Sequence, residues 1–369
     1  MLSYTRTLDQ KIAPPVTIAL DATPLSVPSG GVARYTLELA RALALRFPAD
    51  FYWLLSDQHI PPVAGMPPNL NIGGNPANPL SRKWWILGLQ REMARVGADL
   101  FHGTDFSVPY LPLKPSVMTI HDLSPWLNRE WQPDAGRVRA RTPKLLRLGL
   151  ATMVITPTQA IRRAVIDQFS LSPDRVVAIP LAASDHFSPV KTRPTARPYF
   201  LFVGTLEPRK NVARVIEAWR EIRRSLEVDL VLAGRVRKDF ATPEPEPGLR
   251  LLGAVPESDM PGLYSGAVAC LYPSLYEGFG LPVLEAMQCA ALVITSRDPA
   301  IQEVAGDAAI TVEATDAQAL VRAMRAVLEN PASFTELRQR ALRRAREFTW
   351  TRTAEQTREV YTAALGVCQ

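Results

Sequence analysis

Two glutamates, Glu277 and Glu285, stand eight positions apart and enclose Gly278, Gly280 and Pro282. Glycine lets a backbone come close to a ligand, and proline suits the first turn of a helix, where its missing N–H costs nothing. The free N–H groups at a helix start attract an anion, most simply a phosphate. Two carboxylates beside a phosphate call for a neutral partner, and a carboxylate, which only accepts hydrogen bonds, suits the vicinal hydroxyls of a sugar. The stretch therefore indicates a sugar phosphate or a nucleotide sugar.

A strand and a helix must hold these glutamates in place. The apolar run 268–272 predicts a buried parallel strand. Glu277 then lies on the following loop, and Glu285 lies in the first or second turn of a helix that begins at Pro282. The second carboxylate is thus held rigidly, while the first is carried by a loop.

Two cations, Arg209 and Lys210, follow another predicted strand, 199–204, at the same edge of the sheet. An Arg–Lys pair usually decorates a surface, but at this edge it can neutralise a diphosphate leaving group, which is electrostatic catalysis without a metal. The sequence has no Asp-x-Asp, no His-x-x-x-His and no cysteine cluster. We therefore expect no divalent metal site of the usual nucleotide-sugar type and no other cofactor.

The composition describes an ordinary globular protein. Its 369 residues favour two domains. A formal net charge of +6 is compatible with a nucleotide donor, an acidic membrane surface or nucleic acid, and equally with a solvated basic surface that has no partner. Three separated cysteines, Cys270, Cys289 and Cys368, are typical of a reducing compartment. Without an apolar run long enough to cross a bilayer, or a signal peptide in residues 1–15, we expect a cytoplasmic protein, with peripheral membrane contact left open.

The first half of the chain alternates strands and helices. The predicted strands are 16–20, 51–55, 99–102, 116–120, 153–156 and 176–180, and the predicted helices are 32–45, 81–96, 134–150 and 158–169, with a long loop at 61–80. A strand, Gly30-Gly31 and a helix together form a phosphate-binding arrangement, although Gly-Gly is also an ordinary turn. His121 ends a strand, where open α/β sheets place their ligands, although a lone histidine is more often structural.

Two segments suggest a surface that could touch a membrane. The helical segment 137–147 is basic and amphipathic, and Trp84 and Trp85 stand beside Arg82 and Lys83. Such segments suit anionic lipid or an acidic acceptor. A solvated helix face, and a helix whose tryptophans face the core, are the competing interpretations.

A linker at 183–198 separates this half from a second α/β unit. Its predicted strands are 199–204, 228–233, 249–253, 268–272, 292–295 and 310–312, and its predicted helices begin at 212, 282, 316, 333 and 350. Strands alternating with helices in two blocks predict two doubly wound domains in tandem.

Several motifs in this order resemble the retaining glycosyltransferases of family 4, which have the GT-B fold. Glu277 to Glu285 is similar to their E-x7-E motif. The supporting stretches are Gly204-Thr205-Leu206-Glu207-Pro208-Arg209-Lys210-Asn211, Ile120-His121-Asp122, Ser29-Gly30-Gly31 and Val304-Ala305-Gly306-Asp307-Ala308-Ala309. The resemblance covers nearly the whole chain. It implies a GT-B fold with an acceptor-binding domain at 1–185, a donor-binding domain at 186–348 and a helix at 349–369 that packs back on the first domain.

The resemblance also implies roles for individual residues. Glu277 would hold hydroxyls of the donor sugar, Glu285 would hold the ribose, and His121 would lie near the reacting face of the sugar. The cations Arg209 and Lys210 would stabilise the departing diphosphate. The backbone contributions to the donor site come from Gly30, Gly31, Gly204, Thr205, Gly278, Phe279, Gly280 and Leu281. Thr205 departs from the family, because many members have an arginine there, so the cationic role falls on Arg209 and Lys210.

The forms Gly-Thr-Leu-Glu-Pro-Arg-Lys-Asn and His-Asp-Leu-Ser-Pro (121–125) resemble bacterial mannosyltransferases that build surface polysaccharides. This implies GDP-mannose as donor and a saccharide or polyprenyl-diphosphate-linked oligosaccharide as acceptor, with no nucleic-acid partner. It implies a cytoplasmic enzyme, peripheral at the inner face of the membrane if 137–147 and Trp84-Trp85 face lipid. A UDP-, ADP- or dTDP-sugar donor is the alternative of the same class. An epimerase or a phosphorylase lacks visible support, and a non-catalytic nucleotide-sugar-binding protein is the alternative of another class.

Overall fold

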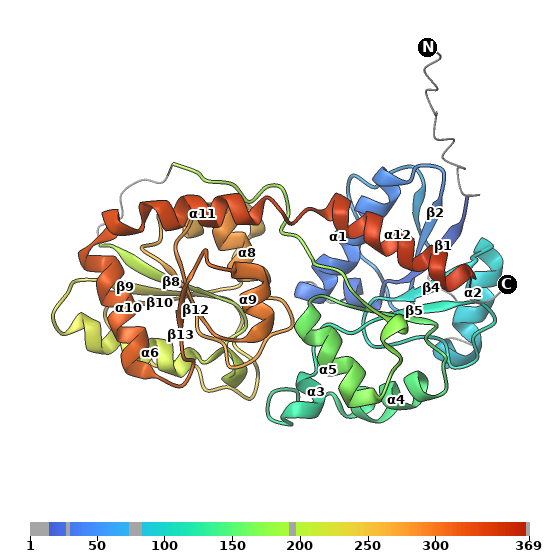
Figure 1. The fold of residues 1–369 in the computed structure, drawn as a ribbon, viewed down its shortest axis with the longest axis horizontal. Helices are drawn as coiled ribbons and strands as arrows, with labels where there is room; N and C mark the ends of the chain where they lie inside the picture. The colour runs from blue at the N-terminus through green and yellow to red at the C-terminus, as the bar shows by residue number, and fades with distance from the viewer. Residues whose placement is uncertain (1–14, 27–29, 74–82, 192–196, 367–369) are drawn as a thin grey trace, which may run out of the picture.

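The computed structural model describes residues 15–26, 30–73, 83–191 and 197–366. Parts of several predictions therefore lie outside the described residues: most of the N-terminal lead-in, Ser29, loop residues 74–80, Ser81 and Arg82, linker residues 192–196, and Cys368. The described chain forms two α/β lobes that lie side by side (Figure 1).

The first lobe is built on a seven-stranded sheet in the order β3-β2-β1-β4-β5-β6-β7, and every neighbouring pair is parallel. The strands β4, β5 and β6 are buried along their whole length, as expected for a parallel sheet covered on both faces. Its elements are β1 (Thr17–Asp21), α1 (Gly31–Arg46), β2 (Phe51–Leu55), β3 (Leu70–Ile72), α2 (Leu89–Val96), β4 (Leu100–Gly103), β5 (Ser116–Thr119), α3 (Ser124–Leu127), α4 (Gly136–Arg147), β6 (Met153–Thr156), α5 (Gln159–Phe169) and β7 (Val176–Ala178).

The second lobe has a six-stranded parallel sheet in the order β10-β9-β8-β11-β12-β13. The order reverses between β8 and β11, which is the point where an open α/β sheet places its ligand. Its elements are β8 (Tyr199–Val203), α6 (Val212–Arg223), β9 (Asp229–Ala233), β10 (Leu249–Gly253), α7 (Met260–Gly266), β11 (Cys270–Tyr272), α8 (Leu281–Gln288), β12 (Val293–Ser296), α9 (Pro299–Ala305), β13 (Ile310–Val312), α10 (Ala317–Glu329) and α11 (Thr335–Ala345).

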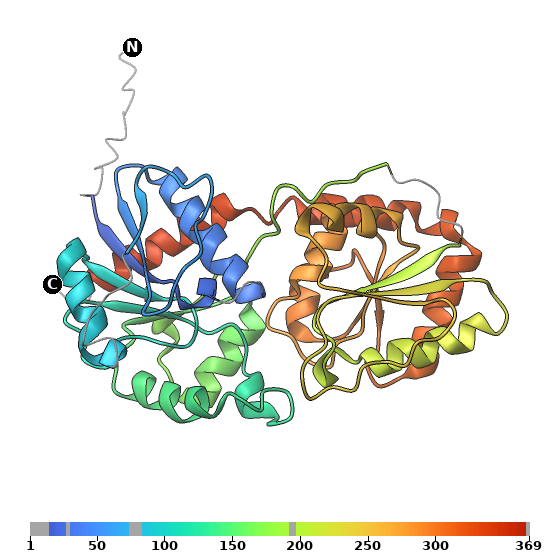
Figure 2. The ribbon, with the colours of Figure 1, turned by 180° about the vertical axis from the view of Figure 1, so that it is seen from behind.

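The last helix, α12 (Trp350–Gly366), returns to the first lobe and packs along α1. Two buried contacts hold it there: Arg358 Nε donates to Asp50 Oδ2 at 2.7 Å, and the Tyr361 hydroxyl lies 2.7 Å from His102 Nδ1. The chain thus crosses between the lobes twice, once after β7 and once between α11 and α12, and both crossings run along the same side (Figure 2). Two crossing segments on one side are suited to act as a hinge between the lobes.

The doubly wound fold class is confirmed, and four local predictions need correction. The loop predicted at 61–80 contains the short edge strand β3, whose three residues give too weak an alternation to be recognised. The helix predicted from Ser81 is described only from Trp84, where a π-helical turn to Gly88 precedes α2. The strand predicted at 268–272 begins at Cys270, and the helix predicted at 134–150 ends at Arg147.

The two tryptophans of this segment differ in burial. Trp84 is buried, and Trp85 is partly buried, packing against the Phe101 ring and under the guanidinium of Arg141. The core-facing interpretation is therefore confirmed for Trp84, and contact of Trp85 with lipid stays a prediction. Among the described residues no helix is long and apolar enough to cross a bilayer.

Candidate active site

The E-x7-E stretch connects β11 to α8 and faces the first lobe. Gly280 is the N-terminal cap of α8 and has a φ of 94°, a left-handed conformation that glycine adopts without strain. Asp298 holds the loop from behind, since its Oδ2 accepts the backbone N–H of Glu277 at 3.2 Å. The Oδ1 of Asp298 caps α9 by accepting from Ala300 and Ile301. Burial raises the pKa of Asp298 to about 6. The position of Glu277 is therefore set by two helix starts rather than by a free loop.

Glu277 meets the two predicted cations in a buried cluster. Lys210 Nζ lies 2.6 Å from its Oε1, and Arg209 Nη1 lies 3.0 Å from its Oε2. Their exposed fractions are only 5% for Glu277, 8% for Arg209 and 9% for Lys210. A carboxylate removed from water is stable as an ion only when it is paired and hydrogen-bonded. The sequence prediction that these three residues share one sheet edge thus corresponds to direct contact.

Second partners fix the direction of each cation. Arg209 Nη2 also donates to Glu207 Oε1 at 3.0 Å, and Lys210 Nζ donates to the Tyr272 hydroxyl at 2.6 Å. Burial would raise the pKa of Glu277, but the charges of Lys210 and Arg209 outweigh it and lower that pKa to about 2. Glu277 is therefore ionised at neutral pH. Burial lowers the pKa of Lys210, and the charge of Glu277 opposes this shift. The groups are aligned before any substrate arrives, which is the arrangement that stabilises developing charge without reorganisation.

Glu285 lies in the second turn of α8 and is 3% exposed. Tyr264 donates its hydroxyl to Oε2 at 2.8 Å, and Arg34 of α1 donates to Oε1. Burial raises the pKa of Glu285, and the charge of Arg34 only partly offsets this. The second carboxylate of the motif is thus held by a cation from the other lobe.

The first lobe touches the loop at its glycines. A side chain at Gly278 would place its Cβ 2.0 Å from the carbonyl oxygen of His121, so only glycine allows this approach. Thr158 Oγ1 donates to the Gly278 carbonyl at 3.2 Å, and a Cβ at Gly31 would lie 3.7 Å from Leu281 Cδ1. The structure therefore brings His121 and Gly31 to the E-x7-E stretch, as the predicted two-domain site requires.

His121 itself is held as a neutral side chain. Its Nε2 lies 2.8 Å from the Thr104 carbonyl, which can only accept, so Nε2 carries the proton. Burial lowers the pKa of His121. The ring packs edge-on against Tyr35, with centroids 4.9 Å apart. His121 is therefore placed to present a neutral face to the cleft.

Three predicted donor-site residues differ in their surroundings. Gly204 has a φ of 145°, and a Cβ at the neighbouring Gly234 would lie 1.8 Å from its carbonyl, so this corner depends on two glycines and not one. Thr205 is exposed and adds no charge. Gly30 is the N-terminal cap of α1 with a φ of 143°. Position 205 thus supplies no cation. The cations near this edge include Arg209, Lys210 and Arg237, whose Nη1 lies 3.5 Å from Glu207 Oε2.

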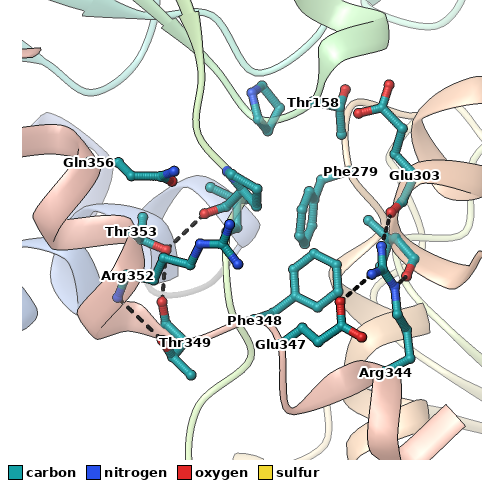
Figure 3. A pocket seen from close by; sticks show the side chains of 14 residues that line it. Thr158, Phe279, Glu303, Arg344, Glu347, Phe348, Thr349, Arg352, Thr353 and Gln356 are labelled. Carbon is teal, nitrogen blue, oxygen red and sulfur yellow. Dashed lines mark hydrogen bonds and ion pairs between the residues drawn. The ribbon is translucent and has the colours of Figure 1, made fainter. Parts of the chain in front are cut away.

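Phe279 belongs to the donor loop but lines a separate cavity of about 210 Å³ on the hinge side (Figure 3). Phe348, at the crossing before α12, meets its ring edge-on at 5.9 Å. Glu303 lies on the same wall and joins the lobes, because its carboxylate accepts the backbone N–H groups of Gln159 at 2.7 Å and Ala160 at 2.6 Å. An acidic group at the start of α5 is favourable there. On the hinge side, too, the two lobes are therefore held together by specific contacts.

Sequence reasoning did not single out Arg34, Tyr264, Tyr272, Asp298 or Glu303. Arg34 follows Gly31 by three residues, about one helical turn, and that spacing was a usable signal for a residue on the same face. Asp298 followed by a proline is a helix-start pattern that was also available. Tyr264 and Tyr272 come from α7 and β11, and only the tertiary structure places them at the two glutamates.

The arrangement can bind a diphosphate between cations and a helix start, with two carboxylates for sugar hydroxyls. The described residues contain no group of three or more His, Cys, Asp or Glu side chains that could hold a metal ion. Arg209, Lys210 and the N-terminus of α8 can supply positive charge to a diphosphate.

Comparison with known proteins agrees with this reading. Residues 29–187 match a family model described as Glycosyltransferase Family 4, and residues 184–348 match one described as Glycosyl transferases group 1. The chain is 30% identical to the "O-antigen chain mannosyltransferase B" of Escherichia coli over 92% of its own length and 97% of that protein. It is 28% identical to the "Serotype-specific mannosyltransferase WbdA" of Escherichia coli, over 69% of this chain and 34% of that longer protein.

Solved structures support the fold. Sucrose-phosphate synthase from Thermosynechococcus elongatus superposes with a TM-score of 0.77 at 20% identity, covering 95% of this chain and 100% of that one. WaaG, described as a glycosyltransferase involved in lipopolysaccharide biosynthesis, superposes with a TM-score of 0.66 at 15% identity, covering 93% and 98%.

Proposed function

Because the chain belongs to glycosyltransferase family 4 and has the GT-B fold, we propose that it moves mannose from GDP-mannose to a saccharide or lipid-linked oligosaccharide with retention of configuration. It is a glycosyltransferase of the group that includes the bacterial O-antigen mannosyltransferases. We further propose that this mannosyl transfer is a step in bacterial surface polysaccharide synthesis.

The contact of Lys210 and Arg209 with Glu277 is the observation that carries the proposal. Two fixed cations on the loop before a helix start suit a departing diphosphate, which needs charge compensation, and the carboxylate beside them suits the hydroxyls of the attached sugar. Mannose is supported by the names of the relatives, since the similarity to one of them extends along nearly the whole chain. The guanine nucleotide is proposed from the resemblance of the stretches 204–211 and 121–125 to bacterial mannosyltransferases. The cations make a metal ion unnecessary, so we propose a metal-independent enzyme.

The proposed step breaks the bond between C1 of the sugar and a diphosphate oxygen and forms a bond from C1 to the acceptor oxygen on the same face. The acceptor proton passes to an oxygen of the leaving phosphate. Arg209 and Lys210 stabilise the charge that develops on the diphosphate. The neutral side chain of His121 borders the reacting face and shapes it without adding charge.

We also propose that the protein works at the inner face of the cytoplasmic membrane, where a lipid-linked acceptor would be presented. The exposed basic residues of α4 are Arg137, Lys144 and Arg147. Leu148, which directly follows α4, is 68% exposed. Arg139 and Arg141 do not belong to this surface, because Arg139 donates to backbone carbonyls and Arg141 donates to Ser107. Basic groups beside an exposed leucine suit an anionic lipid surface.

A panel of GDP-, UDP-, ADP- and dTDP-sugars, read first by thermal shift and then by transfer, tests the donor. A matched ligand at a hundred times its dissociation constant adds about 2.7 kcal/mol of stability. GDP-mannose should raise the melting temperature most and should be the donor consumed. NMR of the new linkage tests retention, and activity in EDTA tests metal independence. Selective stabilisation by another nucleotide would overturn the mannosyl assignment, and stabilisation without transfer to any saccharide would favour a binding protein.

A further inference from the structure

Arg34 reaches from the first lobe to two carboxylates of the second. It lies in the first turn of α1, three residues beyond Gly31. One guanidinium nitrogen, Nη1, contacts Glu285, and the other, Nη2, lies 3.3 Å from Glu257 Oε1. A planar guanidinium presents its N–H donors in a fixed fork, so two of its nitrogens can each hold a different carboxylate.

The carboxylate of Glu285 has no accessible position left. Its Oε2 accepts the Tyr264 hydroxyl at 2.8 Å, its Oε1 accepts Arg34, and its side chain is 4% exposed. A sugar hydroxyl can donate to Glu285 only after a present donor moves. Tyr264 is fully buried on α7 within the same lobe, while Arg34 is 29% exposed and comes from the other lobe. Arg34 is therefore the partner that can leave.

Glu257 provides the place to which Arg34 can move. Its side chain is 48% exposed, so a guanidinium that pairs with it alone is partly solvated. The ring of Phe187 lies 5.8 Å from Arg34 Cζ and gives the cation a further contact. Leaving Glu285 thus does not leave Arg34 as an unpaired buried charge, which would otherwise make the exchange costly.

We propose that Arg34 is a positioning residue that exchanges with the ribose of the nucleotide at Glu285, pairing with Glu285 when the nucleotide leaves and with Glu257 when it binds. The inference rests on the proposed function, which assigns the ribose to Glu285. The exchange couples closure of the lobes to loading of the site, because the Arg34–Glu285 pair spans the cleft. It opposes nucleotide binding and speeds release of the nucleoside diphosphate product.

Arg34→Gln tests this, with Arg46→Gln as the matched control. Arg46 lies on the same helix and forms an exposed ion pair with Glu355, away from the cleft. The glutamine variant should bind GDP about fivefold more tightly, because the competing pair no longer reduces the binding-competent fraction. GDP should also dissociate more slowly, so that kcat falls while KM for the donor falls with it. Arg34→Lys should lie between wild type and Arg34→Gln, and the control should match wild type.

Glu257→Gln should act in the opposite direction. Without its second partner the guanidinium stays on Glu285, and GDP should bind about threefold more weakly. In the Arg34→Gln background the same substitution should change nothing, since Glu257 acts only through Arg34. A loss of GDP affinity in that background would show a direct contact of Glu257 with the nucleotide and would overturn the role assigned to it.

Two results overturn the exchange while leaving the proposed function intact. Weaker GDP binding by Arg34→Gln would show that Arg34 contacts the nucleotide, and unchanged binding and release would show that the pair does not compete. If neither GDP nor another nucleoside diphosphate binds the wild-type protein, the proposed function fails and the exchange fails with it. The melting temperature of each variant without nucleotide shows whether it is folded.

Discussion

The two lobes differ in the charge of the polar side chains that they bury. On the second lobe, Glu277, Arg209 and Lys210 are buried as a network of full charges, each paired at 3.0 Å or less. On the first lobe, the His102 ring is fully buried and contacts two hydroxyls, and the half-buried ring of His121 is neutral and donates to a carbonyl. In the proposed function, the cations of the second lobe neutralise the leaving group, and the neutral ring of His121 on the first lobe borders the sugar.

The lobes also differ in how their groups are kept in place. The charged network is local to the second lobe and is fixed by β8, β11 and α8. The neutral face depends on α12, which belongs to the end of the chain and brings Tyr361 to His102. The first face is thus preorganised within its own domain, whereas the second needs the completed fold.

Lys210→Ala should have the largest effect. It removes one cation from the leaving-group side and leaves Glu277 with Arg209 alone, so kcat should fall by about 10²–10³. Breaking a buried pair should also cost about 3–5 kcal/mol of unfolding free energy. Transfer assays and denaturant unfolding measure both. Arg297→Gln, which breaks the exposed pair with Glu313, is the control and should change neither by much. Activity within about threefold of wild type would exclude charge compensation by Lys210.

Gly278→Ala should move the two lobes apart without changing any charged side chain. Its Cβ would lie 2.0 Å from the His121 carbonyl, so the lobes must move apart. A displacement of this kind can lower kcat/KM by about a hundredfold. Gly262→Ala is the matched control, because a Cβ there meets no atom within 4 Å. If Gly278→Ala is fully active, the contact between His121 and the donor loop is not required for catalysis.

His102 and Glu277 should lose their contributions to the free energy of unfolding over different, overlapping pH ranges. Burial lowers the pKa of His102 to about 3. The unfolded chain therefore takes up a proton near pH 6.5 that the folded chain refuses, and up to about 5 kcal/mol of stability is lost as the pH falls through this window. Glu277 has a lowered pKa of about 2, so its contribution of about 3 kcal/mol is present above pH 4.5 and is lost between pH 4.5 and 2.

Unfolding free energies measured across this range should resolve the windows. His102→Gln should flatten the dependence between about pH 6.5 and 3, and Glu277→Gln should flatten it between about pH 4.5 and 2, so the range above pH 4.5 reports on His102 without Glu277. Asp21, Asp105 and Asp298, whose pKa values burial raises to about 6, add dependence of the opposite sign in every variant. Identical pH profiles for the two variants would contradict the conclusion that His102 is buried neutral and Glu277 is buried as an ion.

The last effect should appear in membrane binding alone and should come from the exposed basic residues of α4. Replacing Arg137, Lys144 and Arg147 by glutamine should weaken binding to anionic vesicles by about 1 kcal/mol per charge and should leave GDP binding unchanged. Co-sedimentation with phosphatidylglycerol vesicles measures the first, and thermal shift measures the second. Unaltered sedimentation would remove α4 as a membrane contact.

The sequence by itself determined the elements and the chemistry that each carries. Apolar runs bounded by turn residues predicted the strands within about two residues, and the pattern Glu277 to Glu285 with Arg209-Lys210 indicated a diphosphate and a sugar. These signals are local, because a strand end, a helix start and the residues beside them are all set by neighbours in the chain. The short strand β3 was missed, since three residues at a sheet edge are defined by their pairing rather than by their own pattern.

Only the tertiary structure decided which groups meet. The contact of Glu285 with Arg34 joins residues 251 positions apart, and that of His102 with Tyr361 joins residues 259 positions apart. The charge on a buried group depends on such partners, because burial alone would make Glu277 hard to ionise, and it is the nearby cations that keep it ionised. The sequence named the acids and bases, while packing set their charge states and placed a cation of one lobe on a carboxylate of the other.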